Sequence, residues 1–587
     1  MTLTDELSAI VGAAFADEDL APSLGRVKAS DRPDLAQFQC NGPLAAAKAS
    51  KRNPREIAEA IVKRLSADRR FSAASIAGPG FINITLEDSF IASRLEALGA
   101  DGKLGAWANP APEEIVLDYG GPNVAKPLHV GHLRSAIIGE SLKRLFRLAG
   151  DTVHADVHLG DWGLQMGQLL SELELRRPDL PYFDEKKVGP FPVESPISLS
   201  DLEEMYPVAS AACKADPARA DLARKATKAL QDGRPGYRAL WRHFVDLSVK
   251  ALKADYRDLG VDFDLWNGEA AVDPLIAEMT ADLEAKGLVE RSDGAQIIRV
   301  ARDDDKKTVP PIILVNSEGA VGYHATDIAT IIDRVRQFSP DRMLYVVDNR
   351  QALHFEQVFR ASELAGYFPE GRLEHLGFGT MNGKDGKPFK TRAGDVVKLR
   401  DLIDMVDAKA RERLAEGGLA EGYDAEELAD VARKVGVSAL KFADLSNPRT
   451  TDYVFDLDRF TAFEGRTGPY LLYASVRVRS VLRKAKEAGV GEPGSLVIDA
   501  GEERDLALRL LSFGDAVRLA YEKRMPHFLC EHAFLLAQAF SKFYASCRIV
   551  DEPRAELRAS RLALAAVTGR QLDLALGVLG IDVPVRM

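Results

Sequence analysis

The chain has 587 residues, of which 46% are hydrophobic and 28% charged, and its formal net charge is −11. This composition is typical of a globular protein of several domains and excludes collagen-like, fibrous and disordered chains. An acidic chain also lacks the overall basic charge of many nucleic-acid-binding proteins, although the net charge does not exclude a local basic surface.

The cysteines, the N-terminal residues and the lengths of the apolar runs exclude further classes of protein. The four cysteines form no C-x-x-C pair, which excludes zinc-ribbon and thioredoxin-type motifs. The first residues, MTLTDELSAIVGAAFADEDL, carry acids where a presequence carries bases. No run of about 18 apolar residues occurs. We therefore expect a cytoplasmic protein with no membrane partner, no zinc and no disulfide scaffold.

The first block, residues 1–109, predicts a small α+β domain. In NPREIAEAIVKRL, Ile57, Ile61 and Leu65 recur every four residues, as one face of a helix requires. FSAASIAGPGFINITL then places a G-P-G turn between two β-type runs. The Gly-, Ala- and Pro-rich stretch LGADGKLGAWANPAPEE ends the block as a linker.

The second block, residues 110–455, predicts a doubly wound, parallel, Rossmann-like sheet. Strands are expected in EEIVLDYGG (113–121), TVHADVHLGD (152–161), AVGYHATDIA (320–329) and RMLYVVDN (342–349), each followed by a helical pattern. Alternating strands and helices are typical of multidomain α/β proteins with a parallel sheet. Between about 178 and 308, long charged helices interrupt this rhythm and indicate a helical insertion.

The third block, residues 456–587, predicts an α-helical bundle, because its apolar residues follow helical spacing. This block is nearly charge-neutral, so the acidic excess lies in the first two blocks. One predicted helix carries a basic cluster with two tyrosines before it: Arg477, Arg479, Arg483, Lys484, Lys486, Tyr470 and Tyr473. Such a mixture suits contacts with RNA phosphates and unpaired bases, and a solvated helix face with buried tyrosines is the other interpretation.

The segment IVLDYGGPNVAKPLHVGHLRSAIIGESLKRLFRLAG carries the strongest chemical signal. A strand ends at Asp118, a glycine turn follows, and H-V-G-H opens an amphipathic helix. His129 and His132 are three residues apart, so both rings can point the same way, and Gly131 leaves room for a nucleotide. The helix N-terminus offers N–H donors and positive potential to phosphate. An accidental H-x-x-H is the plain alternative, and a zinc site lacks a third nearby ligand.

This segment resembles the HIGH signature of class I aminoacyl-tRNA synthetases, and in particular the arginyl-tRNA synthetase family. Five further stretches resemble that family in the same order: GDWGLQMGQL (160–169), GYHATDIAT (322–330), VVDNRQALHFEQV (346–358), GFGTMNGKDGKPFKTRAGDVV (377–397) and RTGPYLLYASVRVRSVLRKA (466–485). The resemblance implies an N-terminal additional domain that contacts tRNA, a class I catalytic domain and an anticodon-binding bundle. It also implies an enzyme that activates L-arginine with ATP and transfers it to the 3′ end of tRNA.

For ATP, the resemblance assigns His129 and His132 to the phosphates. Gly131 and His354 match positions that line the nucleotide site, although a lone histidine on a helix is more often structural. The resemblance further implies that Mg²⁺ accompanies the triphosphate.

The second class I signature usually reads K-M-S-K-S, but here it reads GKDGKPFKTRAG, with Thr391 where the second lysine usually stands. Lys387, Lys390 and Arg392 are the cations near it that could stabilise pyrophosphate. By itself the stretch could equally be a solvated hairpin. Similar family members compensate with a lysine just upstream of HIGH, which here is Lys126.

Arginine recognition needs carboxylates, because a guanidinium is always charged and pairs bidentately with Asp or Glu. The resemblance places Asp118, Tyr323 and Asp327 around the guanidinium, and Asn123 and Gln351 near the backbone end of the amino acid. Taken singly, Asp327 could instead cap a helix, and Asp118 could brace a turn.

Three other functions fit parts of the sequence. Another class I synthetase, or a paralogue that joins an amino acid to a different acceptor, would share the sheet and the HIGH-like segment. A catalytically silent tRNA-binding protein would not need His129, His132 and Lys126. A small-molecule nucleotidyltransferase would not need the helical third block. The resemblance favours arginine, ATP and tRNA as partners, a tRNA requirement for arginine activation, and a monomer.

Overall fold

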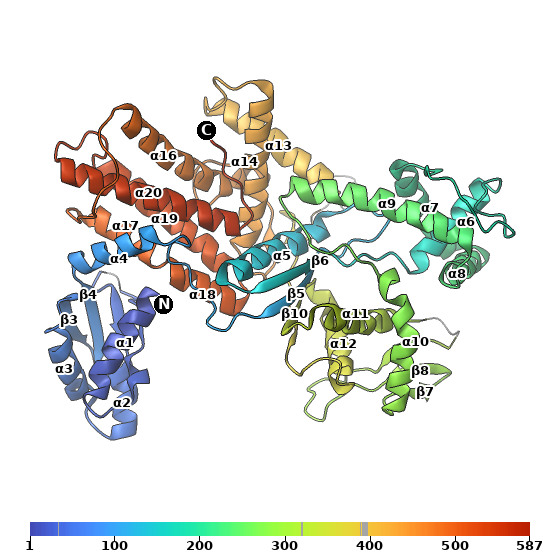
Figure 1. Ribbon diagram of the computed structural model, residues 1–587, viewed down its shortest axis with the longest axis horizontal. Helices are drawn as coiled ribbons and strands as arrows, with labels where there is room; N and C mark the ends of the chain where they lie inside the picture. Colours follow the sequence, from blue (N-terminus) through green and yellow to red (C-terminus); the bar gives the residue numbers. More distant parts are fainter. Residues whose placement is uncertain (33, 318–320, 388, 390–396) are drawn as a thin grey trace.

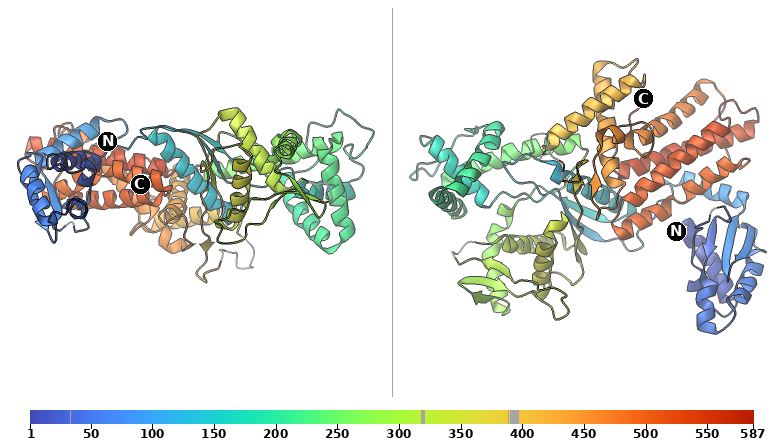
Figure 2. Two further views of the ribbon diagram at one scale, coloured as in Figure 1. Left: turned by 90° about the horizontal axis from the view of Figure 1, so that it is seen from below. Right: turned by 180° about the vertical axis from the view of Figure 1, so that it is seen from behind.

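The computed structural model describes residues 1–587 apart from 33, 318–320, 388 and 390–396. A parallel sheet lies at the centre of the molecule (Figure 1). The N-terminal domain and a helical bundle lie on one side of this sheet, and two further groups of helices lie on the other (Figures 1 and 2). Within the described part of the chain, no helix is long and apolar enough to cross a membrane.

The N-terminal α+β domain forms as predicted. Its four strands pair antiparallel in the order β1-β2-β4-β3. Asn53 caps α3, whose Ile57, Ile61 and Leu65 are buried, and the G-P-G turn joins β3 to β4. The elements are α1 (Leu3–Ala16), β1 (Val27–Ala29), β2 (Phe38–Cys40), α2 (Gly42–Ser50), α3 (Pro54–Leu65), β3 (Phe71–Ala77), β4 (Phe81–Leu86) and α4 (Asp88–Ala100).

The central sheet is parallel, with the order β11-β10-β5-β6. Its strands are β5 (Glu114–Tyr119), β6 (Thr152–Asp156), β10 (Arg342–Val346) and β11 (Leu373–His375). Successive residues of a strand face opposite sides of a sheet. Leu117 and Tyr119 therefore belong to the core that contains α5 (Val130–Ala149), and Val116 belongs to a second core with α10 (Glu269–Ala285), α11 (Tyr323–Phe338) and α12 (Ala352–Leu364). Helices on both faces confirm the doubly wound α/β fold.

One sequence interpretation in this block is wrong. The expected strand does not form in the described residues of AVGYHATDIA: α11 begins at Tyr323, and its buried residues continue at helical spacing through Ile328 and Ile331. The helical insertion is present, and the region from 178 to 308 also contains short strands. Strands β7 (Glu290–Ser292) and β8 (Ala295–Ile298) pair antiparallel with β9 (Ile312–Val315). These strands are too short for an alternating pattern to show in the sequence.

The helical insertion has a core of its own. Met166, Leu202 and Phe244, from three different helices, are buried in one cluster. Its helices are α6 (Leu164–Arg176), α7 (Leu199–Ala215), α8 (Pro217–Gln231) and α9 (Pro235–Asp258). The far end of α9 returns to the main core, where Leu252 and Tyr256 are buried. The insertion is thereby fixed to the sheet.

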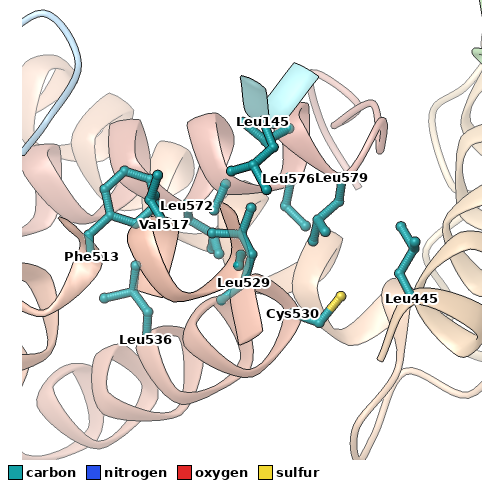
Figure 3. Close-up of a cluster of buried hydrophobic side chains, with 14 of the residues drawn as sticks. Leu145, Leu445, Phe513, Val517, Leu529, Cys530, Leu536, Leu572, Leu576 and Leu579 are labelled. Atoms are coloured by element: carbon teal, nitrogen blue, oxygen red, sulfur yellow. The ribbon is translucent and has the colours of Figure 1, made fainter. Parts of the chain in front are cut away.

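The C-terminal helices form the predicted bundle, and its core is continuous with α5. In Figure 3, Leu145 of α5 and Leu445 of α14 lie with Leu529 and Leu576 of the bundle. A buried ion pair joins the same helices, with Arg134 Nε 3.0 Å from Asp444 Oδ2. The bundle helices are α15 (Leu457–Phe460), α16 (Gly468–Glu487), α17 (Gly501–Leu511), α18 (Phe513–Lys523), α19 (His527–Ser546) and α20 (Ala555–Val578). Two helices of the preceding block, α13 (Leu399–Glu416) and α14 (Ala425–Leu445), pack beside them. Two short parallel strands, β12 (Met381–Asn382) and β13 (Tyr453–Val454), lie between catalytic sheet and bundle in the chain.

Candidate active site

The candidate site lies at the carboxyl edge of the parallel sheet, where ligands bind in doubly wound folds. The chain leaves β5 through Gly120 and Gly121, whose φ values of +93° and +48° favour glycine. A Cβ on Gly120 would lie only 2.8 Å from Tyr256 Oη. The turn therefore requires glycine for its backbone conformation and for close packing, and it delivers the chain to the start of α5.

His129 and His132 hold the first turn of α5 together. His129 Nδ1 accepts a hydrogen bond from the backbone N–H of Gly131 at 3.0 Å, and His132 Nδ1 accepts one from that of His129 at 3.1 Å. Because each Nδ1 accepts, the ring proton sits on Nε2, which is left as a donor. Burial lowers the pKa of both rings, to about 3 for His132. Both imidazoles are therefore neutral at pH 7 and offer Nε2–H groups at a helix N-terminus.

Gly131 is expected to leave room for a nucleotide, and in the structure it also leaves room for a neighbouring side chain. A Cβ at this position would lie 2.7 Å from Cε1 and 2.9 Å from Nδ1 of His129. The space beside Gly131 is therefore occupied by the ring of His129, whose centroid is 4.0 Å from that of His132. A glycine here lets the two rings adopt their paired positions.

Lys126 lies close to these histidines and contacts the insertion. Its Nζ is 4.6 Å from the centroid of the Tyr206 ring on α7, a cation–π contact. The charge of Lys126 contributes to the lowered pKa of both His129 and His132, after burial. Arg350, which the sequence interpretation missed, also lowers the pKa of His129. Two cations, Lys126 and Arg350, therefore lie near the paired histidines.

The cation-rich loop of the second signature is described only at its edges. Lys387 is exposed and its backbone N–H donates to Asp385 at 3.1 Å, whereas Lys390 and Arg392 lie outside the described residues. Residues after the loop return beside the HIGH-like segment: Val130 N–H donates to Val397, and Leu399 N–H donates to Leu128. The two signature segments are thus neighbours.

Tyr323, Asp327 and His354 come together between α11 and α12. His354 Nε2 is 2.6 Å from Asp327 Oδ2, and the rings of Tyr323 and His354 are 4.9 Å apart. The Tyr323 side chain is 63% exposed, so this group opens to solvent. The N-cap of α11 is Gly322, and Asp327 lies inside the helix. The alternative of Asp327 as a helix cap is therefore wrong.

Asp118 is buried at the end of β5 and binds Arg334, which the sequence interpretation also missed. Arg334 Nη2 donates to Asp118 Oδ2 at 2.5 Å and to Asp156 Oδ2 at 2.6 Å. The carboxylate thus pairs with a guanidinium of the protein itself, and it does not brace the turn.

A cavity of about 290 Å³ opens beside Asn123, whose chain forms a bridge to Gly160. Its other lining residues include Lys126, Gln165, Gln168, Tyr206 and Glu269. Burial raises the pKa of Glu269 to about 7, and the nearby Asp327 adds to the rise. Gln351 is exposed just before α12. No motif around Glu269 marks it in the sequence, because it becomes part of the site only through the fold.

The described residues hold no group of three His, Cys, Asp or Glu side chains arranged to bind a metal ion.

The basic residues on α16 differ in their surroundings: some are bound to other side chains and others are exposed. Arg479 is bound to Asp573 at 2.7 Å and to the Pro584 carbonyl at 2.9 Å. Arg477 lies over the rings of Tyr473 and Tyr544, and three residues farther along are exposed: Arg483, Lys484 and Lys486.

Family models match three parts of the chain. "tRNA synthetases class I (R), catalytic domain" matches residues 95–457, "DALR anticodon binding domain" matches 471–587, and "Arginyl tRNA synthetase N terminal domain" matches 1–86. The chain is 54% identical to the arginine–tRNA ligase of Maricaulis maris over 587 residues, with both chains fully covered. It is also 54% identical to that of Hyphomonas neptunium over the full length of both.

Two solved structures of arginyl-tRNA synthetases are similar to this chain in fold. The arginyl-tRNA synthetase of Plasmodium falciparum matches the whole chain with a TM-score of 0.82 and 25% identity, over 99% of its own length. The Thermus thermophilus arginyl-tRNA synthetase shares the fold at a TM-score of 0.79 and 24% identity, with both chains fully covered.

Proposed function

The chain belongs to the class I arginyl-tRNA synthetase family, and from this premise we propose which residues carry out its arginine–tRNA ligase reaction. The arginine carboxylate attacks the α-phosphate of ATP, forming arginyl-adenylate and releasing pyrophosphate. A hydroxyl of the terminal tRNA ribose then attacks the arginyl carbonyl and AMP leaves. Both steps depend mainly on positioning and on charge stabilisation.

His129 and His132 bind the ATP phosphates in this proposal. The observation that carries it is the pair of hydrogen bonds that fixes both Nδ1 atoms as acceptors, because it leaves two neutral Nε2–H donors beside the N-terminus of α5. Fixed donors aimed at developing charge need no reorganisation during the reaction. Gly131 allows this pairing, and the cation of Lys126 beside the rings adds to the positive potential.

The loop cations Lys387, Lys390 and Arg392 complete the phosphate site in the proposal and stabilise pyrophosphate. Their support is the position of the chain after the loop, which is hydrogen-bonded to residues 128 and 130. Mg²⁺ is proposed to arrive with the triphosphate, whose oxygens are its preferred hard ligands.

The guanidinium of the substrate binds among carboxylates. Asp118 and Asp327 are proposed to pair with it, and Tyr323 to cover it, because one carboxylate is buried at the strand end and the other opens beside an exposed ring. His354 orients Asp327 through their 2.6 Å contact and also lines the nucleotide site in this proposal.

Asn123 and Gln351 are proposed to bind the backbone end of arginine. Asn123 supports this assignment because it lines the same cavity as Lys126 and Glu269.

We also propose the division into an N-terminal domain (1–109), a catalytic domain (110–455, with an insertion at about 178–308) and a bundle (456–587). On the bundle, the exposed basic residues of α16 and the ring of Tyr544 are proposed to contact tRNA. Membership of the family supports a cytoplasmic location and a monomer. Light scattering of the purified chain tests the monomer.

Arginine-dependent ATP–pyrophosphate exchange, measured with and without tRNA, tests the whole proposal. Exchange is expected with arginine only, and only when tRNA is present. Asp327→Asn should raise the KM for arginine far more than the KM for ATP. Asp333→Asn, on the same helix and bonded to Gln337, is the matched control and should change neither. Equal small effects of Asp327→Asn on both constants would contradict the arginine site.

Lys126 is tested separately. Lys126→Ala should slow exchange and raise the KM for ATP, whereas Lys187→Ala, which also removes a lysine from an aromatic ring of the insertion, should not. Unchanged exchange in Lys126→Ala would remove Lys126 from the phosphate site.

A further inference from the structure

Two aspartates stand side by side at the end of the central sheet. In the parallel register of β5 and β6, Asp118 lies directly opposite Asp156, and in that of β5 and β10 it lies opposite Tyr345. All three side chains are on the sheet face covered by α11, because Tyr345 and Val116 belong to that core. Like charges directly opposite each other on neighbouring strands repel, so this pair needs a compensating cation.

Arg334 supplies that cation from α11. It follows Asp327 by seven residues, or about two helical turns, and so projects from the same helix face. Its Nη2 bonds to both aspartates, its side chain is only 2% exposed, and its guanidinium carbon lies 5.4 Å from the centroid of Tyr345. Its Nε and Nη1 are buried and have no hydrogen-bond partner among the described residues. The contact is thus made through one nitrogen only.

The charges in this group do not cancel. Two carboxylates share one guanidinium, which leaves one negative charge in excess. The side chain of Asp156 is 3% exposed and that of Asp118 is 12% exposed, so the excess charge is reachable from solvent through Asp118.

We propose that Arg334 is a positioning residue for arginine recognition: it holds Asp118 ionised and oriented, and it sets the charge of the group at one negative unit, which matches one substrate guanidinium. This inference rests on the proposed role of Asp118 in binding the substrate. Arg334 does not touch the substrate itself. With Arg334 and both aspartates in place, this group of three side chains carries one negative charge, which one substrate guanidinium neutralises.

The electrostatic surroundings of Asp118 support this assignment. Burial raises the pKa of Asp118, Asp156 adds to the rise, and Arg334 and His158 oppose it. Tyr345, which lies opposite Asp118 on β10, has its own pKa raised by burial and by Asp118 and Asp327. Removing Arg334 therefore takes away the main group that keeps Asp118 charged.

Arginine KM in tRNA-dependent pyrophosphate exchange, measured from pH 6 to 9, tests the charge count. Arg334→Met leaves two uncompensated carboxylates, so Asp118 takes up a proton; the KM should rise at least about tenfold at pH 6 and fall as the pH rises. Asp156→Asn makes the Asp118–Arg334 pair neutral and should raise the KM by a similar factor without pH dependence. The double variant also removes the repulsion from Asp156 that the loss of Arg334 leaves uncompensated, so it should have a lower KM at pH 6 than Arg334→Met.

The controls separate positioning from stability. Arg336→Met makes the same substitution two residues along α11, where the side chain is exposed and paired with Glu278, and should leave the arginine KM unchanged. A purely structural role of Arg334 predicts that the ATP KM and the melting temperature shift together with the arginine KM, and that the double variant has no lower arginine KM than Arg334→Met. Either result overturns the inference.

Asp118→Asn distinguishes the role of Asp118 from that of Arg334. If it leaves the arginine KM unchanged, the proposed role of Asp118 fails, and the inference about Arg334 fails with it. If it raises the KM while Arg334→Met and Asp156→Asn stay within twofold of the unaltered chain, only the inference about Arg334 fails. Should Arg334→Met not fold, Asp156→Asn, which keeps a side-chain oxygen for Arg334, decides between these outcomes by itself.

Discussion

In the proposed site His132 has two tasks, one for each ring nitrogen, and two substitutions separate them. Its Nδ1 accepts the backbone N–H of His129 at 3.1 Å, and its Nε2–H is left for phosphate. Asparagine places an amide oxygen near the Nδ1 position but does not reach that of Nε2. Glutamine reaches the Nε2 position with an N–H donor but removes the acceptor near the backbone.

The expected magnitudes follow from these contacts. Loss of one donor to a developing charge lowers kcat about 100- to 1,000-fold, or about 3 to 4 kcal/mol. Loss of an N-terminal capping bond costs about 1 kcal/mol of stability. His132→Asn should therefore lose the exchange rate and keep its unfolding free energy within that margin, whereas His132→Gln should be about 1 kcal/mol less stable and keep more activity.

Pyrophosphate exchange in the presence of tRNA gives the rates, and urea denaturation gives the stabilities. Burial lowers the pKa of His132 to about 3, so protonation of this ring should leave no trace in the rate between pH 5 and 9. A His132→Asn variant with normal kcat would refute the donor role. The same conclusion would follow if activity in both variants simply tracked stability.

Three other predictions concern packing, a buried ion pair and pH. Gly131→Ala should lower the exchange rate at least about tenfold, because its Cβ would lie 2.7 Å from Cε1 of His129 and displace that ring. The melting temperature should change little, because alanine itself favours helix. A normal exchange rate would contradict this prediction. Arg134→Met should cost about 3–5 kcal/mol in urea denaturation, because it leaves Asp444 as an unpaired buried charge, and a smaller loss would show that the pair is solvated. Burial lowers the pKa of His532 to about 4, so His532 stabilises the fold above pH 6.5 and loses about 2 kcal/mol of that contribution by pH 5. His532→Phe should remove this part of the pH dependence of the unfolding free energy. An unchanged pH profile in that variant would contradict the prediction.

The sequence predicts the parts of the fold in which a strand is followed by a helix with regular apolar spacing. The strands around residues 115, 153 and 343 are predictable because each is a short apolar run followed by a helical pattern. The error at AVGYHATDIA has the opposite origin. In that window the alternation is too short to separate strand from helix, and the helical spacing becomes clear only when Ile331 and Val335 are included.

The candidate site is predictable where its residues adjoin a motif and not where the fold alone brings them together. His129 and His132 lie in one turn, so their pairing follows from spacing. Arg334, by contrast, is 216 residues from Asp118 and 178 from Asp156. A sequence shows neither that contact nor the reason for Gly131, which depends on the rotamer of a neighbouring ring.

Asp118 and Asp327 are proposed to recognise arginine by the charge of its guanidinium. Citrulline tests this recognition most directly, because citrulline has the same shape as arginine and carries a neutral urea group. In tRNA-dependent pyrophosphate exchange, arginine should support turnover and citrulline should not, even at concentrations about a thousandfold above the arginine KM, since a buried unpaired carboxylate costs several kcal/mol. Exchange with citrulline at a comparable KM would contradict the carboxylate pocket.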